Sequence, residues 1–287
     1  MSEKYRRIPM PARYAINTAL LAALLLGGNA VMSAGIIGRA QSSVILQVGI
    51  YIILAVSLNI ATGYLGQLPL GHAGFMAVGA YAGAIFWKGA GAALPDGVSL
   101  VLGLLVAGLF SAVTGVLIGI PALRLKGDYL AIITLGFGEI IRVVINFLPF
   151  TGGAKGLLRI PAYTNFPYVY GVLVLFVCFI FTLIKSRHGR AIIAIREDEI
   201  AAEAAGIPTT FYKVFTFALA AFMAGVAGGL LACQNRMLIP TTFNFMKSIE
   251  IVVMVVLGGM GSVTGAILAA SVLTIATEAL REFSDYR

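Results

Sequence analysis

The strongest constraint on this chain is a run of about twenty apolar residues that recurs along almost its whole length. Such a run is long enough to cross a hydrocarbon core of ~30 Å as a helix. Because lipid offers the backbone no hydrogen-bond partner, an open-ended segment that crosses it has to be helical. Only 11% of the residues are charged and 60% are hydrophobic, whereas soluble domains have about 25% charged residues. A soluble fold is therefore excluded.

The sequence predicts an all-α fold, a polytopic integral membrane helical bundle with about eight to ten transmembrane helices and some broken or re-entrant elements. Its 34 glycines indicate close helix packing. The whole chain, 1–287, is expected to form a single transmembrane domain. The last two spans are expected to form one interrupted element, because LGGMGSVTG (257–265) is too rich in glycine for an ordinary helix centre. The expected spans are 14–34, 44–62, 71–88, 98–121, 129–148, 168–184, 213–232, 248–260 and 262–280.

The distribution of basic residues predicts the orientation. If the N-terminus is cytoplasmic and the spans alternate, the segments 1–13, 122–128 and 185–213 lie in the cytoplasm and hold eleven Lys and Arg residues, against six on the opposite side. Cytoplasmic loops carry such an excess. The net charge of +8 is explained by this bias and by contact with anionic lipid headgroups, so nucleic acid is not an expected partner.

One polar segment interrupts the apolar pattern, KSRHGRAIIAIREDEIAAEAAGIPTTFYK at 185–213. Its composition predicts a helix from Ala191 to Gly206, ended by Gly206 and Pro208. Two interpretations stay open: a helix that docks in a groove of a soluble partner, or a solvated connector on the membrane surface. Apolar residues recur near helical spacing at Ile192, Ile195, Ile200 and Ala204.

Asn59, Gln67 and His72 form the first polar group within the apolar runs, around GYLGQLPLGH. The glycines and the proline there interrupt a helix. A broken helix at membrane depth exposes backbone groups that can bind an amino-acid zwitterion. The alternative is a simple turn between two spans near the cytoplasmic surface, and a proton relay through His72 is the weakest interpretation.

Glu139 and Arg142 form the second group, three residues apart on one helix and therefore able to pair. Thr134 lies on the same span. Buried polar residues in membrane spans normally face the bundle interior, so these residues are candidates for a substrate path. The alternative is a self-neutralising pair that stabilises packing. LGGMGS (257–262) is expected to serve helix packing rather than substrate contact.

Several kinds of chemistry have no motif in this sequence. It contains no G-x-x-x-x-G-K-[ST] phosphate loop, no His, Cys, Asp and Glu cluster with metal spacing, and no arrangement of a nucleophile and a base. Cys178 and Cys233 lie in or beside apolar runs and form no recognisable metal or disulfide framework. We therefore expect neither an enzyme, nor a cofactor, nor a metal in this chain.

Five stretches resemble the permease subunits of branched-chain amino acid ABC transporters, the LivM type in particular. They lie in the right order between about 57 and 280. They are SLNIATGYLGQLPLGHAGFMAVGAYAGA (57–84), LRLKGDYLAIITLGFGEIIR (123–142), TGGAKGL (151–157), IREDEIAAEAAGI (195–207) and MVVLGGMGSVTGAILAA (254–270).

This resemblance implies a permease in the bacterial inner membrane, which pairs with a second related permease. Two cytoplasmic ATP-binding subunits would drive it and a periplasmic binding protein would deliver leucine, isoleucine or valine. The alternatives are a related permease for urea or short amides, and a secondary transporter independent of ATP. Ile200 stands where the wider importer motif has Glu. The residues that the resemblance assigns to contact with the ATPase are Arg196, Glu197, Asp198, Glu199, Glu203 and Gly206.

Overall fold

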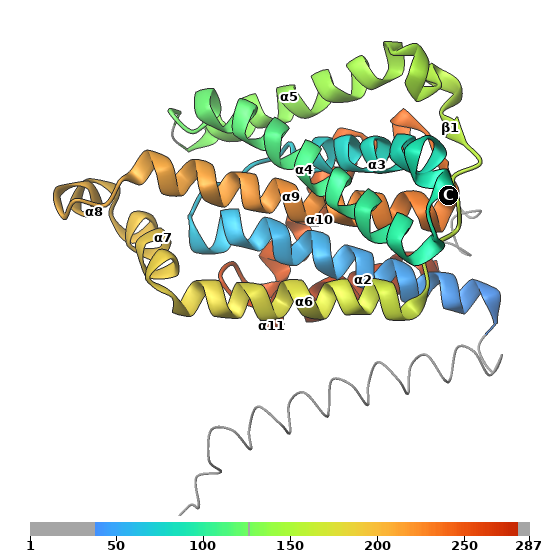
Figure 1. The fold of residues 1–287 in the computed structure, drawn as a ribbon. Coiled ribbons are helices and arrows are strands. Elements are labelled where there is room, and N and C mark those ends of the chain that lie inside the picture. Colours follow the sequence, from blue (N-terminus) through green and yellow to red (C-terminus); the bar gives the residue numbers. More distant parts are fainter. Residues whose placement is uncertain (1–37, 126, 281–287) are drawn as a thin grey trace, which may run out of the picture.

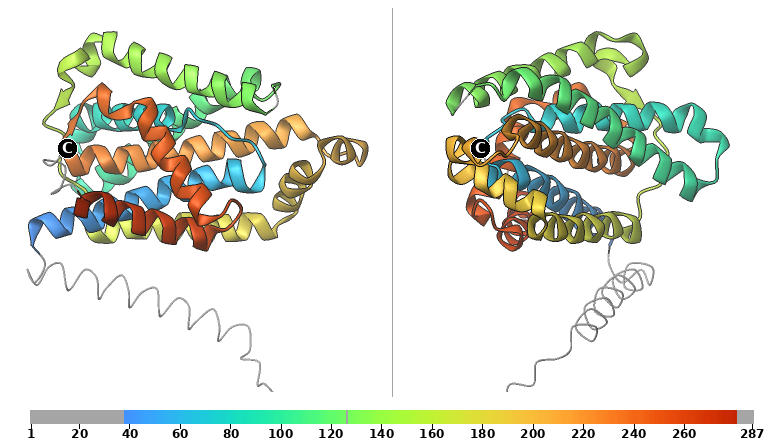
Figure 2. Two further views of the ribbon diagram at one scale, coloured as in Figure 1. Left: turned by 180° about the vertical axis from the view of Figure 1, so that it is seen from behind. Right: turned by 60° about the vertical axis from the view of Figure 1, so that its left-hand side comes forward.

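The structure is a computed structural model that describes residues 38–125 and 127–280. These residues form a bundle of helices with one two-stranded ribbon (Figures 1 and 2). The expected all-α membrane bundle is confirmed. The expected span 14–34 and the side of the membrane taken by the N-terminus lie outside the described residues.

Each of the eight spans expected after residue 40 coincides with a helix. These helices are α2 (Arg39–Asn59), α3 (His72–Lys88), α4 (Asp96–Ala122), α5 (Asp128–Phe147), α6 (Phe166–Lys185), α9 (Thr209–Asn235), α10 (Phe245–Gly258) and α11 (Val263–Ala279). A π-helix, η1 (Ile60–Tyr64), continues α2. In the described part of the chain, the helices long and apolar enough to cross a membrane are Ala40–Tyr64, α4, α5, α6 and α9.

Shorter elements join these helices. The strands β1 (Leu157–Leu158) and β2 (Met237–Leu238) pair antiparallel, with Leu157 opposite Leu238. Two short helices project from the other end of the bundle, α7 (Arg187–Glu197) and α8 (Glu199–Ala204) (Figure 1). The 3₁₀ turns are η2 (Ala90–Ala93), η3 (Pro149–Thr151), η4 (Gly153–Lys155) and η5 (Pro240–Phe243).

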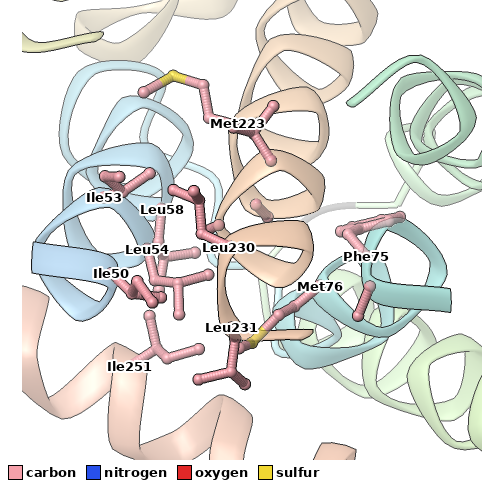
Figure 3. Close-up of a cluster of buried hydrophobic side chains, with 14 of the residues drawn as sticks. Ile50, Ile53, Leu54, Leu58, Phe75, Met76, Met223, Leu230, Leu231 and Ile251 are labelled. Carbon is pink, nitrogen blue, oxygen red and sulfur yellow. The ribbon is translucent and has the colours of Figure 1, made fainter. Parts of the chain in front are cut away.

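The helices divide into central and peripheral ones. In the apolar windows of Ala40–Tyr64 and α9, 78% and 72% of the residues are buried, against 22% in α5 and 17% in α6. The core draws buried side chains from all of these helices, and Figure 3 shows a part of it that α2, α3, α9 and α10 contribute. Peripheral helices instead expose large apolar residues such as Leu117, Phe147 and Val272, which is expected where the solvent is lipid.

Glycine allows the central helices to approach closely, as expected from the composition. A Cβ atom built on Gly79 of α3 would lie 2.3 Å from the Cα of Gly225 in α9, and one built on Gly225 would lie 2.2 Å from the Oγ of Ser111 in α4. Small residues permit such contacts between the backbones of membrane helices. The α3–α9–α4 crossing therefore depends on these positions.

The interruption expected between the last two spans is a reversal of the chain. α10 and α11 form a hairpin (Figure 2). Gly259 and Gly261 turn the chain with φ of 87° and 89°, a region that glycine enters without steric cost. A Cβ atom on Gly265 would lie 1.7 Å from the carbonyl oxygen of Gly258, so the two arms touch backbone to backbone. Residues 257–262 therefore form a turn and take part in a close helix contact, and the absence of a substrate contact there stays a prediction.

The single helix expected from 191 to 206 is wrong, because Asp198 divides it into α7 and α8. Asp198 is extended, with φ of −155°. Its carboxylate accepts hydrogen bonds from the backbone nitrogens of Ile200 (2.9 Å) and Ala201 (3.0 Å). Aspartate at this position caps the start of a new helix.

The break changes which residues of the segment are buried. Ile192 and Ile195 of α7 pack against Leu65. Ile200 and Ala204, which were expected on the same apolar face, are exposed instead, and Ile200 is 76% exposed. The segment therefore presents an isoleucine surrounded by small and acidic residues.

Candidate functional site

The chain between α2 and α3 is a turn that exposes Gly66 and Leu68 and leads into a buried start of α3. After η1 the backbone reverses at Gly66, with φ of 75°, and α3 begins at His72, whose side chain is buried. The Oγ of Ser57 and the Nε2 of His72 are 2.8 Å apart in a hydrogen bond. The first turn of α3 therefore has polar partners inside the bundle, and the interpretation as a turn near the cytoplasmic surface stays a prediction.

A second helix, α10, begins beside the middle of α5, with Phe245 and Met246 exposed. The backbone nitrogen of Phe245 donates to the Oε1 of Glu139 at 3.0 Å. Asn244 caps the helix, because its Oδ1 accepts from the nitrogen of Lys247 at 3.0 Å. A carboxylate is favourable at a helix start, where unpaired N–H groups give a partial positive charge.

The starts of α3 and α10 meet. The backbone nitrogen of Ala73 donates to the Oγ of Ser248 at 3.1 Å, and the nitrogen of Leu70 donates to the Oγ1 of Thr134 at 3.0 Å. Side chains of α10 and α5 thus hold the first turn of α3. We call residues 70–73, 244–248, Thr134 and Glu139 the α3–α10 junction.

Two ion pairs border the junction. Glu139 and Arg142 are 2.7 Å apart with 33% and 31% of their side chains exposed. Lys247 and Glu250 are also 2.7 Å apart, with 17% and 34% exposed, and the Nζ of Lys247 lies 4.5 Å from the ring centroid of Tyr51. Charges inside a membrane bundle normally face a polar cavity or another protein rather than lipid. This side of α5 and α10 is therefore unsuited to lipid contact.

Lys247 and Glu250 were not among the predicted residues, since Lys247 lies just outside the expected span 248–260. Their spacing of three residues is the same as that of Glu139 and Arg142 and was an available signal.

In the structure the α3–α10 junction is closed, because the cavity beside Glu139 and Ser248 measures about 10 Å³, room for roughly one water molecule. None of the predicted site residues lines a larger groove of about 760 Å³ between the start of α2 and the end of α11.

The other predicted path residues lie elsewhere. Asn59 holds the α10–α11 turn: its Oδ1 accepts from the nitrogen of Gly261 at 2.9 Å, and its Nδ2 donates to the carbonyl oxygen of Ser262 at 3.1 Å. Gln67 is half-buried on the loop between α2 and α3. The structure therefore brings His72, Thr134, Glu139 and Arg142 to one region and gives Asn59 a different contact.

The residues predicted to face an ATPase differ in their surroundings. Glu197, Glu203 and Gly206 are exposed, while Asp198 caps α8. The Oε1 of Glu199 is 2.6 Å from the Nζ of Lys213, a lysine that is buried at the start of α9. Arg196 donates through Nη1 to the carbonyl oxygen of Gly63 in η1.

Among residues 38–125 and 127–280 no group of three or more His, Cys, Asp and Glu side chains is arranged to hold a metal. Both cysteines are free, Cys178 exposed and Cys233 buried.

A protein family and two similar proteins are all described as permeases of branched-chain amino acid transport. The family described as "Branched-chain amino acid transport system / permease component" matches residues 40–286. The chain is 37% identical to the high-affinity branched-chain amino acid transport system permease protein LivM of Salmonella typhimurium, over 87% of this chain and 66% of that protein. For LivM of Escherichia coli the identity is 37%, over 83% of this chain and 63% of that protein.

A shorter match extends to a second type of permease. The chain is 41% identical to the high-affinity branched-chain amino acid transport system permease protein LivH of Escherichia coli, over 32% of this chain and 29% of that protein. The chain spans a little less than two thirds of the length of the two LivM relatives. No solved structure matches it.

Proposed function

The chain belongs to the permease family of branched-chain amino acid transport systems, and from this membership we propose that it is the transmembrane subunit of an ATP-driven ABC importer in a bacterial inner membrane. Its substrate would be leucine, isoleucine or valine. Its partners would be a second related permease, two cytoplasmic ATP-binding subunits and a periplasmic binding protein. ATP would be bound by the partner subunits, and this chain would do no chemistry of its own.

The observation that carries the proposal is the surface of α8. Ile200 is 76% exposed on a segment whose neighbours Glu197, Glu203 and Gly206 are also exposed. A short helix that projects from the bundle with exposed apolar and acidic side chains is suited to docking in a groove of a soluble partner. We propose that the segment 185–213 lies in the cytoplasm, as the N-terminus does, and that α8 docks in a cleft of an ATP-binding subunit.

The α3–α10 junction is the proposed substrate path. Half-helices that start at membrane depth direct their positive ends at bound carboxylates in transporters. The two ion pairs beside it give a face that is charged but neutral overall, which suits a zwitterion. Because the junction is closed around Glu139 and Ser248, passage requires that α3 and α10 separate.

A secondary transporter is the competing function. It would more often hold a carboxylate available for ion coupling, and Glu139 already accepts hydrogen bonds from Arg142 and from the nitrogen of Phe245. Urea and short amides are less suitable substrates for this path. They carry no charges that the two ion pairs, Glu139–Arg142 and Lys247–Glu250, could bind.

Uptake by the assembled complex tests the proposal. The chain is co-expressed with its candidate partner subunits, reconstituted in proteoliposomes and supplied with radiolabelled leucine, valine, urea or acetamide. We expect uptake of leucine and valine that requires both ATP and the binding protein. Uptake driven by an ion gradient through this chain alone would contradict the proposal, and selective uptake of urea would contradict the assigned substrate.

A further inference from the structure

Arg196 belongs to the exposed polar segment, but its guanidinium group contacts the bundle. Nη1 donates to the carbonyl oxygen of Gly63 in η1. There is no space for a side chain at Gly63, since a Cβ atom there would lie 2.1 Å from the Oδ1 of Asn59 and 2.2 Å from the nitrogen of Gly261. The end of α7 is thus attached to the point where α2 breaks.

The same point is attached to the α10–α11 turn. Asn59 binds both Gly261 and Ser262 through its side-chain amide. A Cβ atom on Gly261 would lie 3.2 Å from the Nη1 of Arg196, so the guanidinium lies directly beside the turn. We call Arg196, Gly63, Asn59 and Gly261 the Arg196 contact.

The starts of α3 and α10 are both connected to the Arg196 contact along the backbone. From Gly63 the backbone runs through the loop 65–71 into the start of α3. From the turn at Gly261, α10 runs back to its own start at Phe245. The two helix starts meet at the α3–α10 junction, so a displacement at the Arg196 contact reaches both sides of the proposed path.

A second link to the same loop is apolar. Leu65 packs with Ile192, Ile195 and Ala202 of the segment. Such burial is not directional, whereas a hydrogen bond from an ionised donor fixes distance and angle. The apolar cluster therefore holds the segment against the loop, and Arg196 determines its position.

We propose that Arg196 is a positioning residue that transmits movement of α7 and α8 to the α3–α10 junction, and that it does not bind the ATPase. This inference rests on the proposed function, because it requires that ATP hydrolysis by a partner moves the segment. It reassigns Arg196, which sequence resemblance groups with the residues that contact the ATPase.

The test separates ATP hydrolysis from transport in the reconstituted complex. Arg196→Gln shortens the side chain and removes its charge, so the contact with Gly63 is lost. We expect ATPase association and hydrolysis to stay unchanged, while the substrate moved per ATP hydrolysed falls about tenfold or more, as for the loss of a coupling free energy between two sites. Arg196→Lys keeps a charged donor and should restore part of the coupling.

Arg190→Gln is the matched control. Arg190 is also an exposed arginine of α7, but it donates within its own segment, to the carbonyl oxygen of Lys185 at 3.3 Å, and its variant should transport normally. Normal transport by Arg196→Gln would overturn the inference, as would loss of ATPase association in both the Gln and Lys variants. If the unchanged complex moves no substrate with ATP, the proposed function itself fails, whatever Arg196 does.

Discussion

Two ion pairs beside the α3–α10 junction each join residues of a single helix. Glu139 pairs with Arg142 and Lys247 pairs with Glu250, each at 2.7 Å. Each pair is neutral, so neither places a net charge at membrane depth. Removing one partner would leave the other charge without compensation in a low-dielectric region, which costs more than removing both. Both the packing interpretation and the path interpretation of Glu139 predict this stability effect.

A double variant separates the two interpretations. We expect Glu139→Gln to lower the thermal stability of the purified complex and to reduce leucine uptake about tenfold, as for the loss of a hydrogen bond to a charged group worth roughly 1.5 kcal/mol. Glu139→Gln combined with Arg142→Gln should recover thermal stability, because no unpaired charge is left. Uptake should stay low, since the path has lost one of its two ion pairs. Recovery of uptake together with stability would show that the pair serves packing alone.

Sequence reasoning identified some of these residues and missed others for a physical reason. Thr134, Glu139 and Arg142 stand out because they interrupt an apolar run. Lys247 and Glu250 stand at the start of such a run, where charged residues usually belong to a loop. Their inclusion in the bundle depends on where the chain re-enters, and that is set by contacts between α10, α5 and α2 rather than by the local sequence.

At the scale of the element, two broken helices and one divided helix shape the candidate sites. The glycines and the proline of residues 63–71 predicted an interruption, and the apolar runs predicted the long helices. The position of the start of α3 in the bundle was not predictable, because its hydrogen-bond partners are Thr134 and Ser248, which are distant in sequence. The division between α7 and α8 was missed because Asp198 lies among strong helix formers, while its capping role depends on its backbone conformation.

The cap at Asp198 gives a prediction for α8. Removal of an aspartate N-cap costs about 1 kcal/mol, which corresponds to roughly a fivefold change in a local equilibrium. Asp198→Ala should therefore accelerate hydrogen exchange at the amides of Ile200 and Ala201 by roughly that factor. Asp198→Asn keeps an acceptor oxygen and should exchange as the unchanged protein does. Equal exchange rates in the Ala variant would mean that the carboxylate does not hold α8.

At the scale of the whole molecule, the bundle separates two surfaces. Peripheral helices expose large apolar residues, as lipid or another membrane subunit requires, while α7 and α8 project from one end with an exposed isoleucine and exposed acidic residues (Figure 1). The Arg196 contact lies between that end and the interior, where α3 and α10 meet. Our account assigns the projecting end to the ATP-binding subunit and the meeting of α3 and α10 to the substrate.

A cross-link from α8 tests this account most directly. Glu203 is exposed and is preferred to Glu199, which pairs with the buried Lys213. A cysteine is introduced at position 203 after replacement of Cys178 and Cys233, and a cysteine at the exposed Lys155, beside the β1–β2 ribbon, is the control. We predict that position 203 captures the ATP-binding subunit with a yield that changes on addition of ATP, and that position 155 does not. Failure of position 203 to capture that subunit, in a chain that is inserted and transports alone, would contradict the account.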